Sequence, residues 1–504
     1  MIDPNEGLEG KFTLESEKGG VVEEPPFRIL VLGDWSGDGE KKPLAERRPI
    51  EIDRDDFDAV MSRLGVKADL APGSTSLTFA EIEDFHPDEI FRNLPVFKDL
   101  RDLRGRLRDE STFNAAAREV KERFGAAESG QAEPTQEQAA EVPVAEASES
   151  GGGLLDSILA RPTGGGAAPK PGISRDVADL VNEAVRPHLV SVDEGEQSQL
   201  VAALDAATSA LMRRILADPK FKELEAAWRG LYFMVRRTET SPELKIHIFD
   251  ISKAELSDNL KDAASLADTE IYRHLIRDTL ETPGGEPYAV VLGNYAFEPN
   301  IEDIAALIRI SKIAAAANAP FVSHMRPDVF GVHSLDESPD PSAWKLGDQS
   351  DEGKLWAALR DQTESVYLGM AIPRFMARLP YGVDTEPVES FSFEEFDAET
   401  AHDSYVWSNP CFAVGQLLAE SFAEYGWEMG NRLKQDIEGL PVHVYKSGTE
   451  TIYKPCSEVL LTDNAMQKLM DIGLMPLITY KNSDRVKLAR YHSIADTALR
   501  GMWN

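Results

Sequence analysis

The chain has 504 residues, of which 42% are hydrophobic, and this length suggests about three domains. Asp and Glu (87 residues) outnumber Lys and Arg (53), so the formal net charge at pH 7 is −34. This balance argues against broad nucleic-acid binding and against docking on anionic lipid, because both require clustered basic side chains. We therefore expect the partners to be proteins or cations.

Cysteine usage and the N-terminus bear on the cellular compartment. The two cysteines, Cys411 and Cys456, are too few for a disulfide framework or a cysteine-based zinc site. The first residues lack the basic and apolar regions of a signal peptide, and no uncharged apolar run reaches the roughly 18 residues that cross a bilayer. The sequence therefore predicts a cytoplasmic protein with no membrane insertion.

The first predicted domain covers residues 26–125, after an N-terminal arm of residues 1–25. Phe27–Gly33 is an apolar run that ends at Gly, which predicts a buried strand followed by a turn. Asp53 precedes residues at helical spacing and is expected to cap an amphipathic helix. From Pro87 to Phe124 the pattern is again helical, with Leu100, Leu103 and Leu107 on one face.

Residues 126–172 differ in composition from the rest of the chain. They are rich in Ala, Glu, Gly, Pro and Ser and nearly free of aromatic residues, which is typical of a flexible linker. One apolar island, residues 154–159, interrupts them, and its large side chains share one face of a short helix: Leu154, Leu155, Ile158 and Leu159. Such a helix is too short to be stable alone and is expected to fold on a partner.

The second predicted domain covers residues 173–480. Helical stripes run from Leu200 to Ile215 and from Phe221 to Val235, and strands are expected at 244–251, 288–293 and 320–323, with a helix at 301–317 before the last of these. Strand, helix and strand in this order predict an α/β layer. Residues 481–504 are expected to form a C-terminal tail with a short helix.

The sequence contains no strong motif for a catalytic or metal-binding site. The glycine-rich segment Gly33–Gly39 follows a strand, but it lacks the Lys of a phosphate-binding loop and the spacing of a nucleophile elbow. The histidines, for example His324 and His402, form no pair at helical metal-ligand spacing. Adjacent Glu394 and Glu395 point in different directions on any regular element, which favours solvated or structural roles over acid–base chemistry. We therefore predict no catalytic residue, cofactor or metal, although an α/β enzyme using the turn stays as a remote alternative.

Several strings resemble the large sheath subunit of the bacterial type VI secretion system. They keep that family's order from about Asp218 to Tyr480: WRGLY at 228–232, RTETSPELKI at 237–246, GGEPY at 284–288, ISKIAAAANAPF at 310–321, PRFMARLPYG at 373–382, PVESF at 387–391, FAEYGW at 422–427, EGLPVH at 438–443 and GLMPLI at 473–478. The family's large subunit continues past this stretch, so the resemblance implies a C-terminally shortened version.

The first domain resembles the small sheath subunit of the same system. The strings that carry this likeness are FRILVLGDWSG at 27–37, RPIEIDRDDFD at 48–58, LTF at 77–79 and DFHPD at 84–88. The chain therefore resembles a fusion of two sheath subunits. The expected fold class is mixed α/β: a small α/β module, a linker with a short helix at 154–159, and a larger α/β module of the contractile tail sheath type.

The resemblance also gives roles to two short segments. The island of Leu154, Leu155, Ile158 and Leu159 resembles the helix that a Clp-type AAA+ unfoldase recognises when it recycles contracted sheath. Family members lend terminal strands to neighbouring protomers, and Lys11–Ser16, with Phe12 and Leu14, is a candidate strand-exchange arm.

The function that the resemblance implies is structural and non-enzymatic. We expect a cytoplasmic sheath component that assembles around the inner tube and drives its ejection. Its expected partners are other sheath protomers, the inner tube protein, the baseplate and the unfoldase. The alternative is a sheath-like accessory protein, for example a cap, baseplate adaptor or length limiter, that does not polymerise by itself.

Overall fold

The computed structural model describes residues 24–70, 75–124, 196–345, 350–396, 402–447 and 449–504. They form two compact units, which divide the chain differently from the ranges expected from the sequence. The first unit comprises Met1–Val66, Leu224–Leu379 and Ala401–Asn504, and the second comprises Lys67–Glu223 and Pro380–Thr400. The expected small module is thus shared between the units, with β1 in the first unit.

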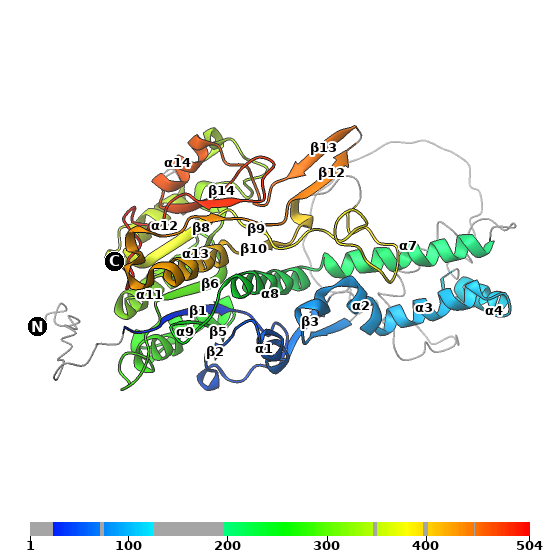
Figure 1. Cartoon of the computed structure of the whole chain (residues 1–504), viewed down its shortest axis with the longest axis horizontal. Helices are drawn as coiled ribbons and strands as arrows, with labels where there is room; N and C mark the ends of the chain where they lie inside the picture. The colour runs from blue at the N-terminus through cyan, green and yellow to red at the C-terminus, as the bar shows by residue number, and fades with distance from the viewer. Residues whose placement is uncertain (1–23, 71–74, 125–195, 346–349, 397–401, 448) are drawn as a thin grey trace, which may run out of the picture. The chain divides into compact units, whose positions relative to one another are not determined.

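A nine-stranded sheet forms the centre of the first unit (Figure 1), in the order β11-β15-β14-β8-β7-β6-β1-β5-β2. Its strands are β1 Phe27–Gly33, β2 Ile50–Glu51, β5 Leu244–Asp250, β6 Val290–Phe297, β7 Phe321–Met325, β8 Leu368–Ile372, β11 Asp436–Ile437, β14 Leu474–Thr479 and β15 Val486–Leu488. The six strands from β14 to β5 are mutually parallel, and β2 and β15 are antiparallel to their neighbours in that group.

Strand β1 lies in the interior of this sheet, between strands that come more than 200 residues later. Phe27 pairs with Leu244 of β5, and Ile29 pairs with Val290 of β6. Six of its seven residues are buried, as expected for a parallel strand covered on both faces. The predicted strand at these residues is confirmed, and its position joins the N-terminal part of the chain to the rest of the unit.

Helices cover the two faces of the sheet. Helix α13 packs against six strands, including β1 and β6, and helix α11 packs against α9 and β7. The helices of this unit are α1 Phe57–Leu64, α9 Lys253–Asp262, α10 Glu270–Tyr272, α11 Ile301–Ala317, α12 Asp351–Arg360, α13 Pro410–Tyr425 and α14 Asp463–Asp471, while α8 Pro219–Arg237 contributes residues to both units. The mixed α/β fold class is confirmed.

Local hydrogen bonds explain where the helices begin. The Asn300 side chain accepts a hydrogen bond from the Asp303 amide and caps α11, which occupies the predicted residues. The prediction for Asp53 is wrong, because α1 begins at Phe57. Asp53 instead accepts hydrogen bonds from the amides of Asp55 and Asp56 in the preceding turn.

The second unit contains a two-stranded sheet and a helical layer. Its elements are β3 Val66–Leu70, β4 Thr75–Phe79, α2 Pro87–Asn93, α3 Pro95–Arg108, α4 Phe113–Phe124 and α7 Glu196–Leu216. Leu100, Leu103 and Leu107 are buried along α3, as the helical spacing predicts. Arg104 of α3 and Asp205 of α7 form an ion pair at 2.5 Å, so these two helices are joined by charge as well as by packing.

Residues 481–504 differ from the tail that the sequence analysis expects. They supply β15, which pairs with both β14 and β11, and they place the buried side chain of Trp503 beside Phe27 with ring centroids 6.0 Å apart. They form no helix. The remaining short strands are β9 Phe375–Met376, β10 Trp407–Ser408, β12 His443–Ser447 and β13 Glu450–Lys454. Among the described residues, no helix is long and apolar enough to span a bilayer.

The central position of β1 predicts that the two halves of the chain need each other. If the chain is expressed as two polypeptides, residues 1–160 and 161–504, we expect a stable one-to-one complex. Without the first polypeptide, β5 and β6 lose the strand between them, and unpaired strand edges favour aggregation. Co-purification and light scattering measure both outcomes.

A matched control deletes Phe27–Gly33 from the first polypeptide. We expect this deletion to abolish co-purification. If residues 161–504 alone were monodisperse and unfolded at the same temperature as the complex, β1 would not have the structural role inferred here.

Candidate functional site

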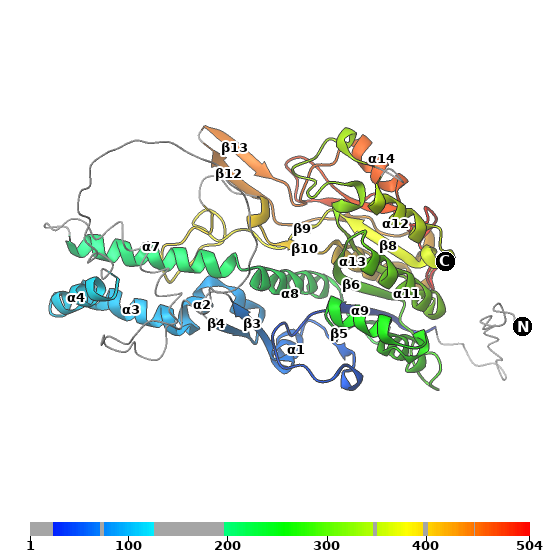
Figure 2. The same cartoon turned by 180° about the vertical axis from the view of Figure 1, so that it is seen from behind.

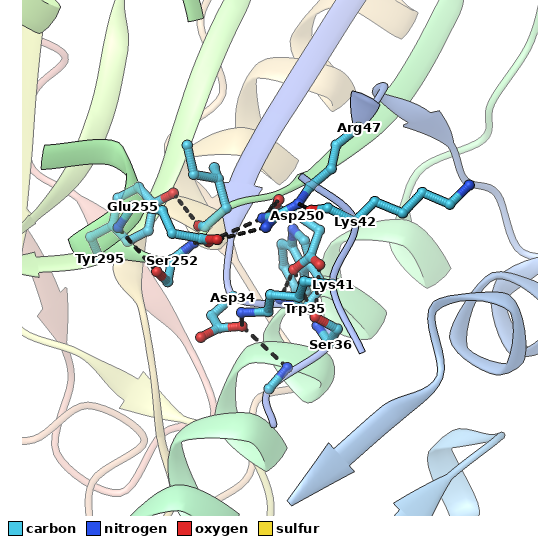
Figure 3. A network of polar contacts seen from close by, with 12 residues as sticks. Asp34, Trp35, Ser36, Lys41, Lys42, Arg47, Asp250, Ser252, Glu255 and Tyr295 are labelled. Carbon is cyan, nitrogen blue, oxygen red and sulfur yellow. Dashed lines mark hydrogen bonds and ion pairs between the residues drawn. The ribbon is translucent and has the colours of Figure 1, made fainter. Parts of the chain in front are cut away.

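The turn that follows β1 is held by a carboxylate at the end of β5. Asp250 Oδ1 accepts hydrogen bonds from the amides of Trp35 (2.8 Å) and Ser36 (3.2 Å), and its Oδ2 accepts one from Ser36 Oγ (2.7 Å). Asp34 Oδ1 accepts from the Gly37 amide at 3.1 Å and pairs with Lys41 at 2.6 Å. Figure 3 shows these groups converging on the turn. Both carboxylates therefore accept hydrogen bonds from backbone amides of the turn and stabilise its conformation.

Close packing accounts for the last glycine of the turn. A Cβ atom on Gly39 would lie 2.4 Å from the carbonyl oxygen of Gly65, too close for any side chain. Glycine at position 39 therefore has a steric reason within the fold.

Trp35 anchors the turn in the core of the first unit. Its side chain is fully buried, and its ring centroid lies 5.4 Å from that of Trp228 and 6.4 Å from that of Phe412. Trp228 Nε1 donates a hydrogen bond to the carbonyl oxygen of Trp35 at 2.9 Å. Three distant segments therefore meet at one aromatic cluster.

A second ion pair ties the segment before β2 to α9. Arg47 donates two hydrogen bonds to the carboxylate of Glu255, at 2.6 and 3.0 Å, and a third to the carbonyl oxygen of Asp250. Burial acts to raise the pKa of Glu255, but the hydrogen bonds from Arg47 and the Ser252 amide and the positive charge of Arg47 together outweigh burial, and the pKa falls to about 2. Glu255 also completes a capping box with Ser252 at the start of α9. The network in Figure 3 therefore connects the turn after β1 and the segment before β2 to the end of β5 and to α9.

The most buried carboxylate of the unit is Glu225, which is fully inaccessible. It pairs with Arg378 at 2.6 Å and with Arg229 at 2.7 Å. Burial acts to raise the pKa of Glu225, but the two arginine charges outweigh burial and lower it. The negative charge of Glu225 is therefore compensated by two arginines of the same fold, and the lowered pKa keeps this carboxylate ionised.

The other residues weighed from the sequence also bind within the fold. His324 Nδ1 lies 2.9 Å from the carbonyl oxygen of Ala371, and burial lowers the pKa of His324 to about 4. In the second unit, the Glu395 carboxylate accepts from the Tyr381 amide and the Glu394 carboxylate accepts from the Val383 amide. The structural role expected for these two glutamates is confirmed.

A surface groove of about 440 Å³ lies between α9 and α11. Its polar side chains are Ser265, Arg309 and Lys312, and the rest of its lining is aliphatic: Leu260, Ala263, Ala264, Leu266, Ala305 and Ile308. The lining has no carboxylate, histidine or cysteine that would supply acid–base or nucleophilic chemistry.

The predicted interaction residues lie outside the described residues. Leu154, Leu155, Ile158 and Leu159 fall in residues 125–195, and Phe12 and Leu14 fall in residues 1–23. Conversely, sequence reasoning missed Asp250, Arg47 and Glu255. The spacing of Ser252 and Glu255 is a capping-box signal that marks the start of α9, but the partners of Asp250 are more than 200 residues away in the chain.

The three hydrogen bonds at Asp250 predict a sharp dependence of stability on this side chain. Asp250→Ala would leave the amides of Trp35 and Ser36 without their acceptor, and we expect a loss of about 2–4 kcal/mol in the free energy of unfolding. Urea unfolding, followed by tryptophan fluorescence, measures the loss.

Asp34→Ala is the matched control, because the Asp34 side chain is 44% exposed and its ion pair with Lys41 is partly exposed to solvent. We expect that variant to lose less than about 1 kcal/mol. Equal losses in the two variants would contradict the role assigned to Asp250.

Comparisons with known proteins give matches over both parts of the chain. Residues 9–124 match the family described as "Type VI secretion system, VipA, VC_A0107 or Hcp2". Residues 198–495 match the family described as "VipB: EvpB/VC_A0108, tail sheath N-terminal domain". The two matches follow one another in the order that the resemblance to small and large sheath subunits implies, and that resemblance is confirmed.

A curated relative supports the second match. The chain is 36% identical over 291 residues to the type VI secretion system sheath protein TssC1 of Pseudomonas aeruginosa. The alignment covers 56% of this chain and 58% of that relative. Because the tail sheath match takes in more than half of its residues, this chain belongs to the VipB tail sheath protein family.

Proposed function

We propose that the protein is a fused structural subunit of a type VI secretion contractile sheath. In this role it acts in the cytoplasm without catalysis, joins other sheath protomers around an inner tube, and contacts the baseplate at one end. The observation that carries the proposal is the position of β1. A strand from the range that matches the small-subunit family pairs on both sides with strands from the range that matches the tail sheath family.

Fusion has a physical consequence for such a protomer. The association of two separate subunits depends on the concentration of each subunit. A covalent link makes the pairing of β1 with β5 and β6 intramolecular, so this pairing no longer depends on concentration. The link also fixes the stoichiometry at one to one. A sheath needs many identical protomers, so both consequences favour this role.

Assembly is the direct test of the proposal. Negative-stain microscopy of the purified chain, alone and with its inner tube protein, is expected to show hollow tubes or stacked rings of regular repeat. Small particles under all conditions would contradict the sheath role. Particles that bind only to the ends of tubes made by a separate sheath pair would favour the accessory alternative.

The same assay examines the proposed strand-exchange arm. If residues 11–16 add a strand to a neighbouring protomer, the double variant Phe12→Asp and Leu14→Asp will form shorter tubes or none, because charges replace the apolar side of the strand. The variant Thr13→Asp adds a charge to the other side of the strand and serves as the control.

We also propose that residues 154–159 bind a Clp-type AAA+ unfoldase. The support is the apolar face formed by Leu154, Leu155, Ile158 and Leu159 together with the flanking glycines at 151–153 and 164–166. A short apolar helix can dock in a hydrophobic groove on a partner. Recycling of contracted sheath would follow from this contact.

Charge placed on that face is expected to abolish unfoldase binding. In pull-downs with the purified unfoldase, the double variant Leu155→Asp and Ile158→Asp should lose at least about tenfold in affinity, since apolar anchors dominate such docking. Ser157→Asp adds charge beside the apolar face and is the control that should retain binding. Unchanged binding by the double variant would contradict this role for the island.

A further inference from the structure

The hairpin of β12 and β13 carries an exposed apolar face. The two strands pair only with each other, and Val444 lies opposite Tyr453 across them. Side chains of directly opposed residues lie on the same face of an antiparallel pair. Val444 is 42% exposed and Tyr453 is 46% exposed, which is unusual for large apolar side chains of one face. In Figures 1 and 2 the hairpin projects from the rest of its unit.

A hollow lies at the base of this face. Its volume is about 120 Å³, and its lining includes Tyr453 of β13, Leu460 and Lys481. Leu460 is itself 41% exposed. Pockets for free small molecules usually measure about 300–1,000 Å³, so this hollow suits one side chain of a partner protein rather than a separate ligand.

The hairpin is fixed to the body of the unit at its root. Lys454 Nζ lies 3.3 Å from a carboxylate oxygen of Asp336 and 3.0 Å from His402 Nδ1. The hydroxyl group of Tyr405 lies 2.7 Å from His443 Nδ1. A surface that is already rigid before binding loses little conformational entropy on docking, so these contacts favour a binding role.

The charge beside the apolar face is positive. Lys446 lies two residues from Val444 and therefore on the same face, and both Lys446 and Lys481 are exposed. The chain as a whole carries −34 charges. A partner with an apolar side chain next to a carboxylate would complement this surface, and another copy of the same acidic chain has such residues.

Among the residues that the structure describes, Ile301 fits this description best. It is the first residue of α11, it is 73% exposed, and Glu302 follows it. Helix α11 holds Ile301 in a fixed position, because the Asn300 cap and a long buried face anchor its start. Val383 is equally exposed, at 74%, but it lies outside helices and strands.

We propose that Ile301 of one copy inserts into the hollow formed by Tyr453 and Leu460 of a second copy, with Glu302 facing Lys481. The inference rests on the proposed sheath function and names one surface through which protomers associate. A side chain on one copy that fits a hollow elsewhere on the next makes a head-to-tail contact, and repeated head-to-tail contacts build rings or open helical arrays.

Cross-linking between two single-cysteine variants tests the contact directly. The two native cysteines are buried, so the full-length variants Ile301→Cys and Leu460→Cys each expose one new thiol. After mixing with a short bismaleimide, covalent dimers should form in the mixture and not in either variant alone. Val383→Cys mixed with Leu460→Cys is the matched control and should give none.

Three results of this experiment would overturn the proposal. Dimers from Val383→Cys in place of Ile301→Cys would assign the hollow to another surface of the second copy. Dimers from Phe12→Cys in place of Ile301→Cys would assign it to the N-terminal arm. Absence of dimers from every mixture would show that copies do not meet at the hollow.

A charge exchange gives a second, independent readout. Glu302→Lys and Lys481→Glu are each expected to raise the protein concentration needed for assembly by about tenfold, because each places like charges across the contact. The double variant should restore assembly. Thermal unfolding of all three variants, expected to be unchanged, separates loss of contact from loss of fold.

This pair of assays also separates the inference from the proposed function. If the parent chain forms tubes and the charge variants assemble equally well, this contact is wrong and the sheath role stands. If the cross-link forms but the parent chain never assembles into tubes, the contact stands and the sheath role is wrong. If neither forms, both are wrong.

Discussion

The structure depends on one backbone interaction, the pairing of β1 with β5 on one side and β6 on the other. Without it the nine-stranded sheet would divide into β2 and β5 on one side and the six strands from β6 to β11 on the other. The turn at Asp34–Gly39 and the aromatic cluster around Trp35 are both positioned by the end of this strand. The N-terminal strand and the later part of the chain therefore form one sheet in the first unit.

The sequence predicts those elements whose signal is local. The strand at Phe27–Gly33 and the helix at Ile301–Ala317 have the predicted bounds, because each is a continuous apolar or periodic run with a clear stop or cap. The order of strands in the sheet could not be predicted, since it is set by contacts between distant segments. Val486–Leu488 show the same limit: these three residues are too few to give a strand pattern, and they form β15 because they pair with β14 and β11.

The same distinction applies to the candidate site. Spacing alone showed that Gly33–Gly39 lacks the residues of a phosphate loop, but it gave no hint of Asp250, whose partners are more than 200 residues away. Family resemblance supplied what periodicity could not, namely the likeness to two sheath subunits. Both carboxylates of this network have partners within the fold. Asp250 accepts hydrogen bonds from backbone amides, and Glu255 pairs with Arg47.

The position of β1 has a consequence for synthesis of the chain. Phe27 leaves the ribosome 217 residues before its partner Leu244, and at about 5–20 residues per second this delay lasts roughly 10–40 s. During that time an apolar strand has neither of its final neighbours, which is the condition under which nascent chains aggregate or recruit chaperones. The acidic, polar residues made in the interval keep the growing chain hydrated. In a fused chain the formation of this sheet is therefore limited by the time needed to synthesise the partner strands, and not by the concentration of a separate subunit.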